Sequence, residues 1–126
     1  MRIVDSFMFF DENMMLDLRL NVLDKYVSKF IICESKFNHN GQKKELNFNI
    51  NNFSKFKSKI EYYVVEDQPN NLKKINSEDS IKQKESKILD NALIRENYQR
   101  NLTYSRLKKF DEEDLILVND LHEIPN

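Results

Sequence analysis

The sequence contains one glycine, one cysteine and two prolines among its 126 residues. The single glycine, Gly41, excludes the glycine-rich phosphate loops of P-loop enzymes and of dinucleotide-binding folds. A bound nucleotide would therefore be held by a metal ion, by arginine or lysine, or by backbone amides of other residues. The lone Cys33 excludes an internal disulfide framework and a zinc site made of cysteines only.

Long hydrophobic runs are also missing near the N-terminus, where the apolar residues 7–10 are followed at once by Asp11 and Glu12. This run is too short for a signal peptide or a membrane span, so we expect a soluble, cytoplasmic protein. Twenty basic and 21 acidic residues give a net charge of -1. No overall positive field favours a nucleic-acid partner.

The chain does contain aromatic core material, with nine phenylalanines and five tyrosines. This content separates it from disordered sequences of similar polarity. Its length suits one hydrophobic core and is too short for two ordinary domains. We therefore predict a single domain over residues 1–126.

Hydrophobic patterning predicts alternating strands and helices. Four short segments rich in β-branched and aromatic residues read as strands, at residues 3–10, 30–33, 60–65 and 115–118. Leu16, Leu20, Leu23 and Val27 form one face of an amphipathic helix, with Arg19 off that stripe. We further expect a short helix within 48–59, a long polar connection over 68–85 and the longest helix over 86–110.

This order of elements predicts an α/β fold with an open, mainly parallel sheet and helices on both faces. Ligands of such sheets bind outside the carboxyl ends of the strands. Acidic residues follow every predicted strand there, and such a crevice suits a divalent cation. These residues are Asp11, Glu12, Glu34, Glu66, Asp67, Asp120 and Glu123.

The segment after the last strand offers a candidate metal site. In an extended chain Asp120 and His122 point to the same side, so both can ligate one metal ion that bridges the phosphates of a nucleotide. Glu123 is a further candidate ligand. The alternative is a solvated acidic turn.

One turn of the longest predicted helix carries Arg95, Gln99 and Arg100, which can reach a diphosphate or a sugar. The alternative is an exposed helix with one ion pair between Glu96 and Arg100, worth only about 0.3–0.5 kcal/mol.

Two further carboxylates lie in or beside strands. Glu34 at a strand end is a candidate for holding a sugar or base hydroxyl, with a surface ion pair as the alternative. Asp5 lies inside the first strand, where we expect it to be half-buried and satisfied by a lysine or arginine. Cys33 is expected to be a small core residue.

Four ordered blocks of the sequence resemble glycosyltransferase family 17, which includes β-1,4-mannosyl-glycoprotein β-1,4-N-acetylglucosaminyltransferase. The resemblance runs over residues 3–126, in blocks at 3–12, 34–41, 95–101 and 114–126. It implies a Rossmann-like domain of the GT-A type that binds a UDP-sugar with Mn²⁺ or Mg²⁺. The implied reaction transfers a sugar, N-acetylglucosamine, to a hydroxyl of a glycan acceptor.

The resemblance also implies roles for particular residues. Asp120 matches the first acid of the family's Asp-x-Asp-Glu-Ile-Pro metal motif, and Glu123 matches its glutamate. His122 stands where the second acid is expected, and a neutral imidazole brings no negative charge to the metal. The implied donor-binding residues are Asp11, Glu34, Arg95, Gln99 and Arg100.

Family members are longer, so we expect this chain to be the donor-binding, amino-terminal half, ending before the acceptor-binding half. One alternative function is a non-catalytic remnant or interaction module of the same half fold, able to self-associate through an exposed sheet edge. A weaker alternative is a metal-dependent phosphohydrolase that uses Asp5, Asp120 and Glu123.

Overall fold

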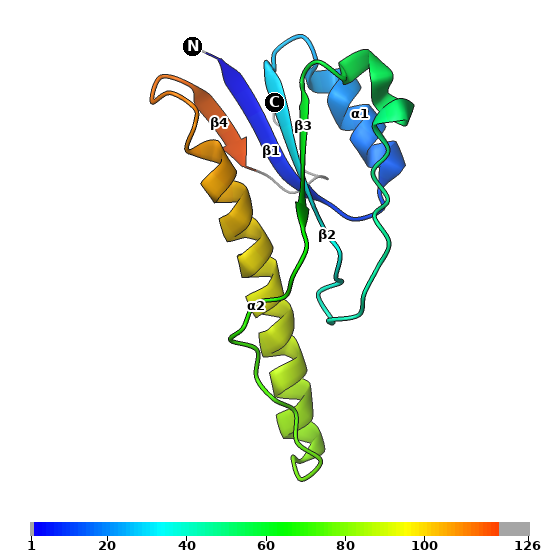
Figure 1. Ribbon diagram of the computed structural model, residues 1–126, viewed down its shortest axis with the longest axis vertical. Coiled ribbons are helices and arrows are strands. Elements are labelled where there is room, and N and C mark those ends of the chain that lie inside the picture. Colours follow the sequence, from blue (N-terminus) through cyan, green and yellow to red (C-terminus); the bar gives the residue numbers. More distant parts are fainter. Residues whose placement is uncertain (1, 119–126) are drawn as a thin grey trace.

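The computed structural model of the chain describes residues 2–118 (Figure 1). This part contains four strands, two α-helices and one 3-10 helix. They are β1 (Ile3–Phe9), α1 (Asn13–Leu23), β2 (Lys29–Ser35), the 3-10 helix η1 (Ile50–Phe56), β3 (Ile60–Val65), α2 (Ile81–Leu107) and β4 (Leu115–Val118). None of the described helices is both long enough and apolar enough to cross a membrane.

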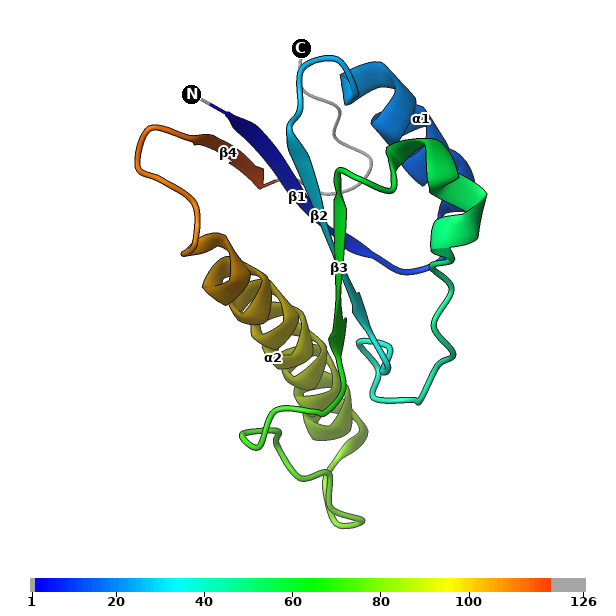
Figure 2. The same cartoon turned by 45° about the horizontal axis from the view of Figure 1, so that its top comes forward.

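The four strands form one open sheet in the order β3-β2-β1-β4, and every neighbouring pair is parallel. The predicted α/β class and the parallel sheet are therefore confirmed. The chain moves outward from β1 to β3 and then returns to place β4 on the other side of β1. Helices α1 and η1 lie on one face of the sheet and α2 lies on the other (Figures 1 and 2).

The face under α1 and η1 holds the main hydrophobic core. Alternate side chains of β1 and β2 meet the inward stripe of α1 and two phenylalanines of η1, because side chains alternate across a strand. The buried members are Phe7, Phe9, Leu16, Leu20, Leu23, Val27, Phe30, Ile32, Phe53 and Phe56. Burying each such side chain contributes about 1.5–3 kcal/mol relative to leaving it in water.

A charged pair lies within this core. The Arg19 guanidinium and the Asp5 carboxylate are both fully buried. The guanidinium donates two hydrogen bonds of 2.7 Å to the carboxylate. The guanidinium also lies over the ring of Phe7, 5.0 Å from its centroid. The expectation that Arg19 lies off the buried stripe was wrong, because Asp5 in a covered strand requires a cation at that point.

The face under α2 has a smaller and more polar interior. Its buried apolar cluster consists of Val4, Ile31 and Leu107. Cys33 and Val65 are also buried on this face, but several other buried residues there are polar, and they include Ser6, Gln99 and Thr103. Burial raises the pKa of the Cys33 thiol, which lies beneath Gln99 and Thr103.

Helix α2 begins earlier than the sequence predicts. Ser80 and Gln83 form a capping box, in which each side chain binds the other residue's backbone N–H. The helix therefore starts at Ile81 and ends at Leu107 instead of spanning 86–110. Its first turns extend past the carboxyl edge of the sheet (Figure 1).

Candidate functional site

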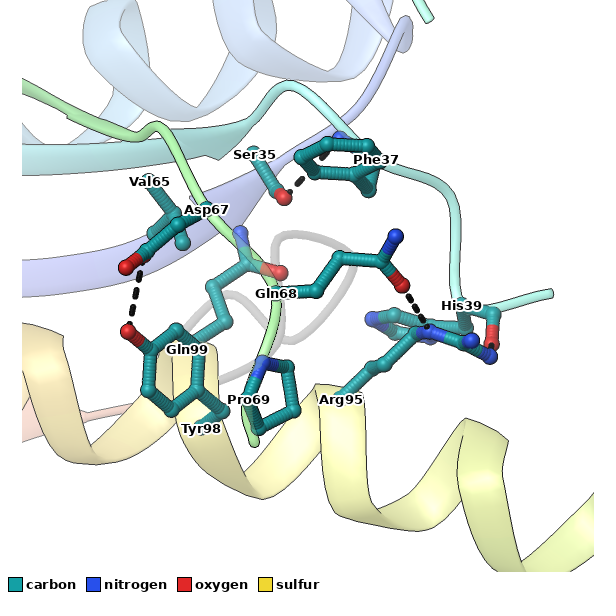
Figure 3. Close-up of a pocket in the computed structure, with 10 residues that line it drawn as sticks. All are labelled: Ser35, Phe37, His39, Val65, Asp67, Gln68, Pro69, Arg95, Tyr98 and Gln99. Atoms are coloured by element: carbon teal, nitrogen blue, oxygen red, sulfur yellow. Dashed lines mark hydrogen bonds between the residues drawn. The ribbon is translucent and has the colours of Figure 1, made fainter. Parts of the chain in front are cut away.

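The carboxyl ends of β2 and β3 meet the middle of α2 around a narrow pocket (Figure 3). This position agrees with the rule that ligands of open parallel sheets bind beyond the carboxyl ends of the strands. Three segments build the pocket: the two strand ends with the loops that follow them, and one turn of α2. Its lining residues are Ser35, Phe37, His39, Val65, Asp67, Gln68, Pro69, Arg95, Tyr98 and Gln99.

Arg95 connects α2 to both loops at the pocket. Its Nε donates to Gln68 Oε1 at 2.8 Å, and its Nη1 donates to the backbone oxygen of His39 at 2.9 Å. The guanidinium lies against Gly41, where an added Cβ would come within 2.5 Å of Nη2. Gly41 also has a φ of +89°, a left-handed conformation that favours glycine. The only glycine of the chain thus lies where the β2 loop approaches the arginine.

Gln99 lies one helical turn beyond Arg95 and is buried. Its Nε2 donates to the backbone oxygen of Cys33 at 3.2 Å. The opposite orientation of the amide would place two oxygens face to face, so this contact fixes which atom points into the pocket. Within residues 2–118 its Oε1 has no hydrogen-bond partner. A buried acceptor without a donor is uncommon, so we expect water, a ligand or another part of the chain to supply one.

The mouth of the pocket is closed by side-chain contacts. Tyr98 donates from its hydroxyl to Asp67 at 2.8 Å, and this bond raises the pKa of Tyr98. Gln68 lies between Gln99 and Arg95 (Figure 3). The contacts of Tyr98 and Gln68 are partly exposed, so a ligand can replace them at modest cost.

Glu34 is fully buried at the end of β2, where its carboxylate accepts four hydrogen bonds. The donors are Lys44 Nζ at 2.6 Å, the backbone N–H of Asn47 at 2.7 Å, the backbone N–H of Phe48 at 3.1 Å and the Tyr62 hydroxyl at 2.7 Å. Burial and the bond to Glu34 raise the pKa of Tyr62. The carboxylate therefore anchors the loop that follows β2.

Asp11 lies in a separate shallow hollow at the end of β1, beside Asn38, Lys44 and Asn47. The same β2 loop separates this hollow from the pocket that holds Arg95. Asn47 Nδ2 donates to the backbone oxygen of Phe10 at 2.7 Å, and the Phe10 and His39 rings meet edge to face at 5.0 Å. The hollow and the pocket thus lie on opposite sides of one anchored loop.

Arg100, the third predicted residue of α2, does not line the pocket. Its guanidinium binds Glu96 at 3.1 Å, one turn away on the same helix. The structure thus brings Arg95 and Gln99 together and places Arg100 apart from them.

The acidic residues at the strand ends do not gather in the described part of the chain. Glu66 pairs with Lys36 at 3.5 Å, and Asp67 accepts the hydrogen bond from Tyr98. Within residues 2–118 no three acidic, histidine or cysteine side chains come together as a metal site. The predicted metal ligands Asp120, His122 and Glu123 lie outside the described residues.

Comparison with known families identifies the chain's relatives. The family model for glycosyltransferase family 17 matches residues 1–126. The chain belongs to glycosyltransferase family 17. A search of curated proteins and a search of solved structures each found no significant match. Membership of family 17 supports a glycosyltransferase function, and it implies a nucleotide-sugar donor and an acceptor as partners.

The structure adds pocket residues that were not selected as site residues from the sequence. These are Gln68, Tyr98 and the backbone oxygen of His39, all of which contact groups around Arg95 or Asp67. Gln68 carried no motif. Tyr98 lies in the block 95–101 but was given no role, although a helical-wheel projection of α2 would have placed it beside Arg95.

Proposed function

We propose that this chain is the donor-binding part of a glycosyltransferase that takes N-acetylglucosamine from a UDP-sugar and transfers it to a hydroxyl of a glycan. The observation that carries the proposal is the pocket at the carboxyl ends of β2 and β3, which is lined by Arg95 and by Gln99, whose Oε1 has no partner within residues 2–118. It occurs in a chain of glycosyltransferase family 17.

The polar groups of this pocket favour a nucleoside or sugar over a bare phosphate. Gln99 offers a buried acceptor, Oε1, which only an N–H or O–H donor can satisfy. The imide N–H of uracil and the hydroxyls of ribose or of the sugar are such donors, whereas an ionised phosphate is not. Arg95 supplies the positive charge next to it, and a ligand that binds this guanidinium would replace Gln68.

Asp11 and Glu34 have different parts in this proposal. Asp11 is exposed at the end of β1 and is free to accept from a ligand hydroxyl. Glu34 acts by holding the β2 loop, because its carboxylate already accepts four hydrogen bonds within the fold. Arg100 stays a predicted phosphate ligand, although its guanidinium binds Glu96.

A divalent cation, Mn²⁺ or Mg²⁺, is proposed to be held by Asp120 and His122, with Glu123 as a further ligand. These residues follow β4, whose last residue, Val118, lies beside Ser6 in the middle of β1. When bound, such a cation would offset the charge that develops on the leaving diphosphate. Asp120 and Glu123 supply oxygen ligands of the kind that these ions prefer, while His122 supplies a nitrogen.

Thermal unfolding with ligands tests the proposal. We expect UDP together with Mn²⁺ to raise the melting temperature, and either one alone to raise it less. Arg95→Lys should remove most of this shift, while Arg106→Lys, a matched change at an exposed position of the same helix, should preserve it. Mixing UDP-N-acetylglucosamine with a glycan acceptor and measuring released UDP then tests transfer. No shift at millimolar UDP and Mn²⁺ would contradict donor binding.

The non-catalytic alternative predicts a different result from the same experiment. An interaction module would show self-association through the open sheet edge and no response to nucleotide. The phosphohydrolase alternative is weakened, because Asp5 is fully buried and both of its carboxylate oxygens bind Arg19.

A further inference from the structure

Helix α1 carries a second row of apolar side chains that does not face the sheet. Its inward side is formed by Leu16, Leu20 and Leu23. The outer row recurs every four residues: Met14, Leu18 and Val22 lie on α1 and Tyr26 lies in the turn that follows it, with 89, 48, 45 and 59% of their surface exposed. The outer side of a solvated helix normally carries polar residues, so this row marks an interaction surface.

The outer row borders an apolar groove between α1 and the edge strand β4. Val22 and Tyr26 form one wall of the groove, and Leu115 and Leu117 form the other. Its remaining lining residues are Ile3, Leu23 and Val27. The row and the groove are therefore one continuous apolar surface.

Within residues 2–118 no helix or strand covers this surface, and the handedness of parallel sheets accounts for the side on which the described helices lie. The chain passes from β1 to β3 in one direction with α1 and η1 on one face, and it returns to β4 with α2 on the other face (Figure 2). A further parallel strand beside β4 would continue in the second direction. Its right-handed crossover would then lie on the α2 face and would leave the groove uncovered.

We propose that a second copy of this chain docks on this surface, with the two α1 helices antiparallel about a two-fold axis. Such an axis places Met14 of each copy opposite Tyr26 of the other, and Leu18 opposite Val22. Because Val22 and Tyr26 also line the groove, Met14 of one copy lies at the groove mouth of the other. A flexible, nearly fully exposed methionine is suited to filling an irregular apolar groove. The contact is isologous, as most homodimer contacts are.

The charges beside the outer row fit this arrangement. Asp17 lies on α1 and Lys25 lies in the turn after it, where the Val27 N–H still donates to the Leu23 oxygen, so continuing the helical spacing puts both on the same flank of the row. Asp17 is bonded to Asn21 and Lys25 lies over the Tyr26 ring, and neither is in an ion pair within residues 2–118. Antiparallel pairing brings Asp17 of each copy next to Lys25 of the other. The two-fold axis thus produces two complementary ion pairs on one flank of the contact.

This inference does not rest on the proposed function, because the α1 surface and the pocket that contains Gln99 lie on opposite faces of the sheet. Failure of nucleotide binding would leave it intact. Conversely, a monomeric chain could still bind UDP.

Sedimentation velocity of the full chain, from about 1 µM to about 500 µM, tests self-association over the range expected for a weak to moderate homodimer. We expect the mass to rise from monomer to dimer. Leu18→Glu should raise the dissociation constant at least about tenfold, because it buries a charge in the contact. Leu93→Glu is the matched control on α2, at a side chain that is 58% exposed, and should leave the constant unchanged. A chain that stays monomeric, or equal weakening by both variants, would overturn the proposal and assign the surface to a different partner.

Charge exchange tests the antiparallel arrangement itself. At low salt, Asp17→Lys and Lys25→Asp should each weaken the dimer by about threefold to tenfold, because each places like charges together. The double variant should return to the affinity of the original chain. Single variants without effect, or a double variant as weak as the single ones, would rule out this pairing.

Discussion

The two faces of the sheet share the same strands but are packed with different chemistry. The α1 face buries ten hydrophobic residues around one charged pair that is completely internal. The α2 face has a buried hydrophobic cluster of three residues, with Cys33 and Val65 buried beside it, and its interior includes Ser6, Gln99 and Thr103. In the described residues, the unpartnered oxygens of Ser6 and Gln99 lie on this second face.

This difference separates the face that stabilises the fold from the face that is suited to bind a ligand. Apolar burial supplies most of the stabilising free energy, so the α1 face dominates stability. Buried polar groups without partners cost free energy, and they persist mainly where a ligand or water completes them. The α2 face is therefore the face on which a site is expected, and four changes test this contrast.

The largest effect is expected from breaking the charged pair of the α1 face. Arg19→Met leaves the Asp5 carboxylate buried and should lower the free energy of unfolding by about 3–5 kcal/mol, measured by urea denaturation. Asp5→Asn together with Arg19→Met should recover part of this loss, because no unpaired charge remains. A loss below about 1 kcal/mol in the single variant would show that the pair contributes little.

Matched leucine truncations compare the two cores directly. Leu20→Ala on the α1 face should cost about 2–5 kcal/mol, because a fully packed core collapses poorly around a cavity. Leu107→Ala lies in the three-residue cluster at the end of α2 and should cost about 2 kcal/mol or less. Equal losses would remove the distinction between a main and a minor core.

The third change separates binding from stability on the α2 face. Gln99→Leu removes one hydrogen bond and one unpartnered acceptor together, so we expect stability to change by no more than about 1 kcal/mol. The melting-temperature shift with UDP and Mn²⁺ should be lost. Thr103→Val, one turn further along the buried side of α2, should keep that shift. If Gln99→Leu still responds to UDP, the pocket is not the donor site.

The smallest effect is expected at the end of the sheet where strands β1 and β4 begin. Arg2 binds Asp114 through its guanidinium and its backbone N–H, and the hydrogen bond from Arg2 lowers the pKa of Asp114. A lowered carboxyl pKa adds stability above the ordinary pKa of aspartate, and this stability is lost as the pH falls through the lowered value. Asp114→Asn should therefore reduce the loss of stability caused by acid. The measurement is the protection of the β4 amides against hydrogen exchange, compared between pH 7 and pH 3 in the variant and in the original chain. If the stability of the variant depends on pH in the same way as that of the original chain, the Asp114 carboxyl is not the group whose protonation weakens this contact.

The sequence was sufficient for the fold because strand and helix signals agreed locally. Residues 60–65 and 115–118 were predicted at the observed bounds of β3 and β4, since β-branched and aromatic residues cluster there. The start of α2 was missed because its first turns are polar and exposed, so hydrophobic periodicity is absent there. Ser80 and Gln83, spaced as a capping box, carried the signal that hydrophobicity did not.

The site was only partly predictable, because distant contacts decide which polar residues face inward. Arg95 and Gln99 share one side of α2, and their four-residue spacing indicated this. Whether Glu34 faces ligand or loop depends on Asn47, Phe48 and Tyr62, which are 13 to 28 positions away in the sequence. Such contacts follow from the topology, which local patterns do not encode.

Gly41 makes the position of Arg95 sensitive to a residue 54 positions away in the sequence. Any side chain there would have to adopt a left-handed backbone and displace the guanidinium, which would then give up Gln68 and the His39 oxygen. Mutational tolerance in the β2 loop should therefore fall sharply at this one position. Transplanting a different loop between β2 and η1 would succeed only if the new loop also leaves that space vacant.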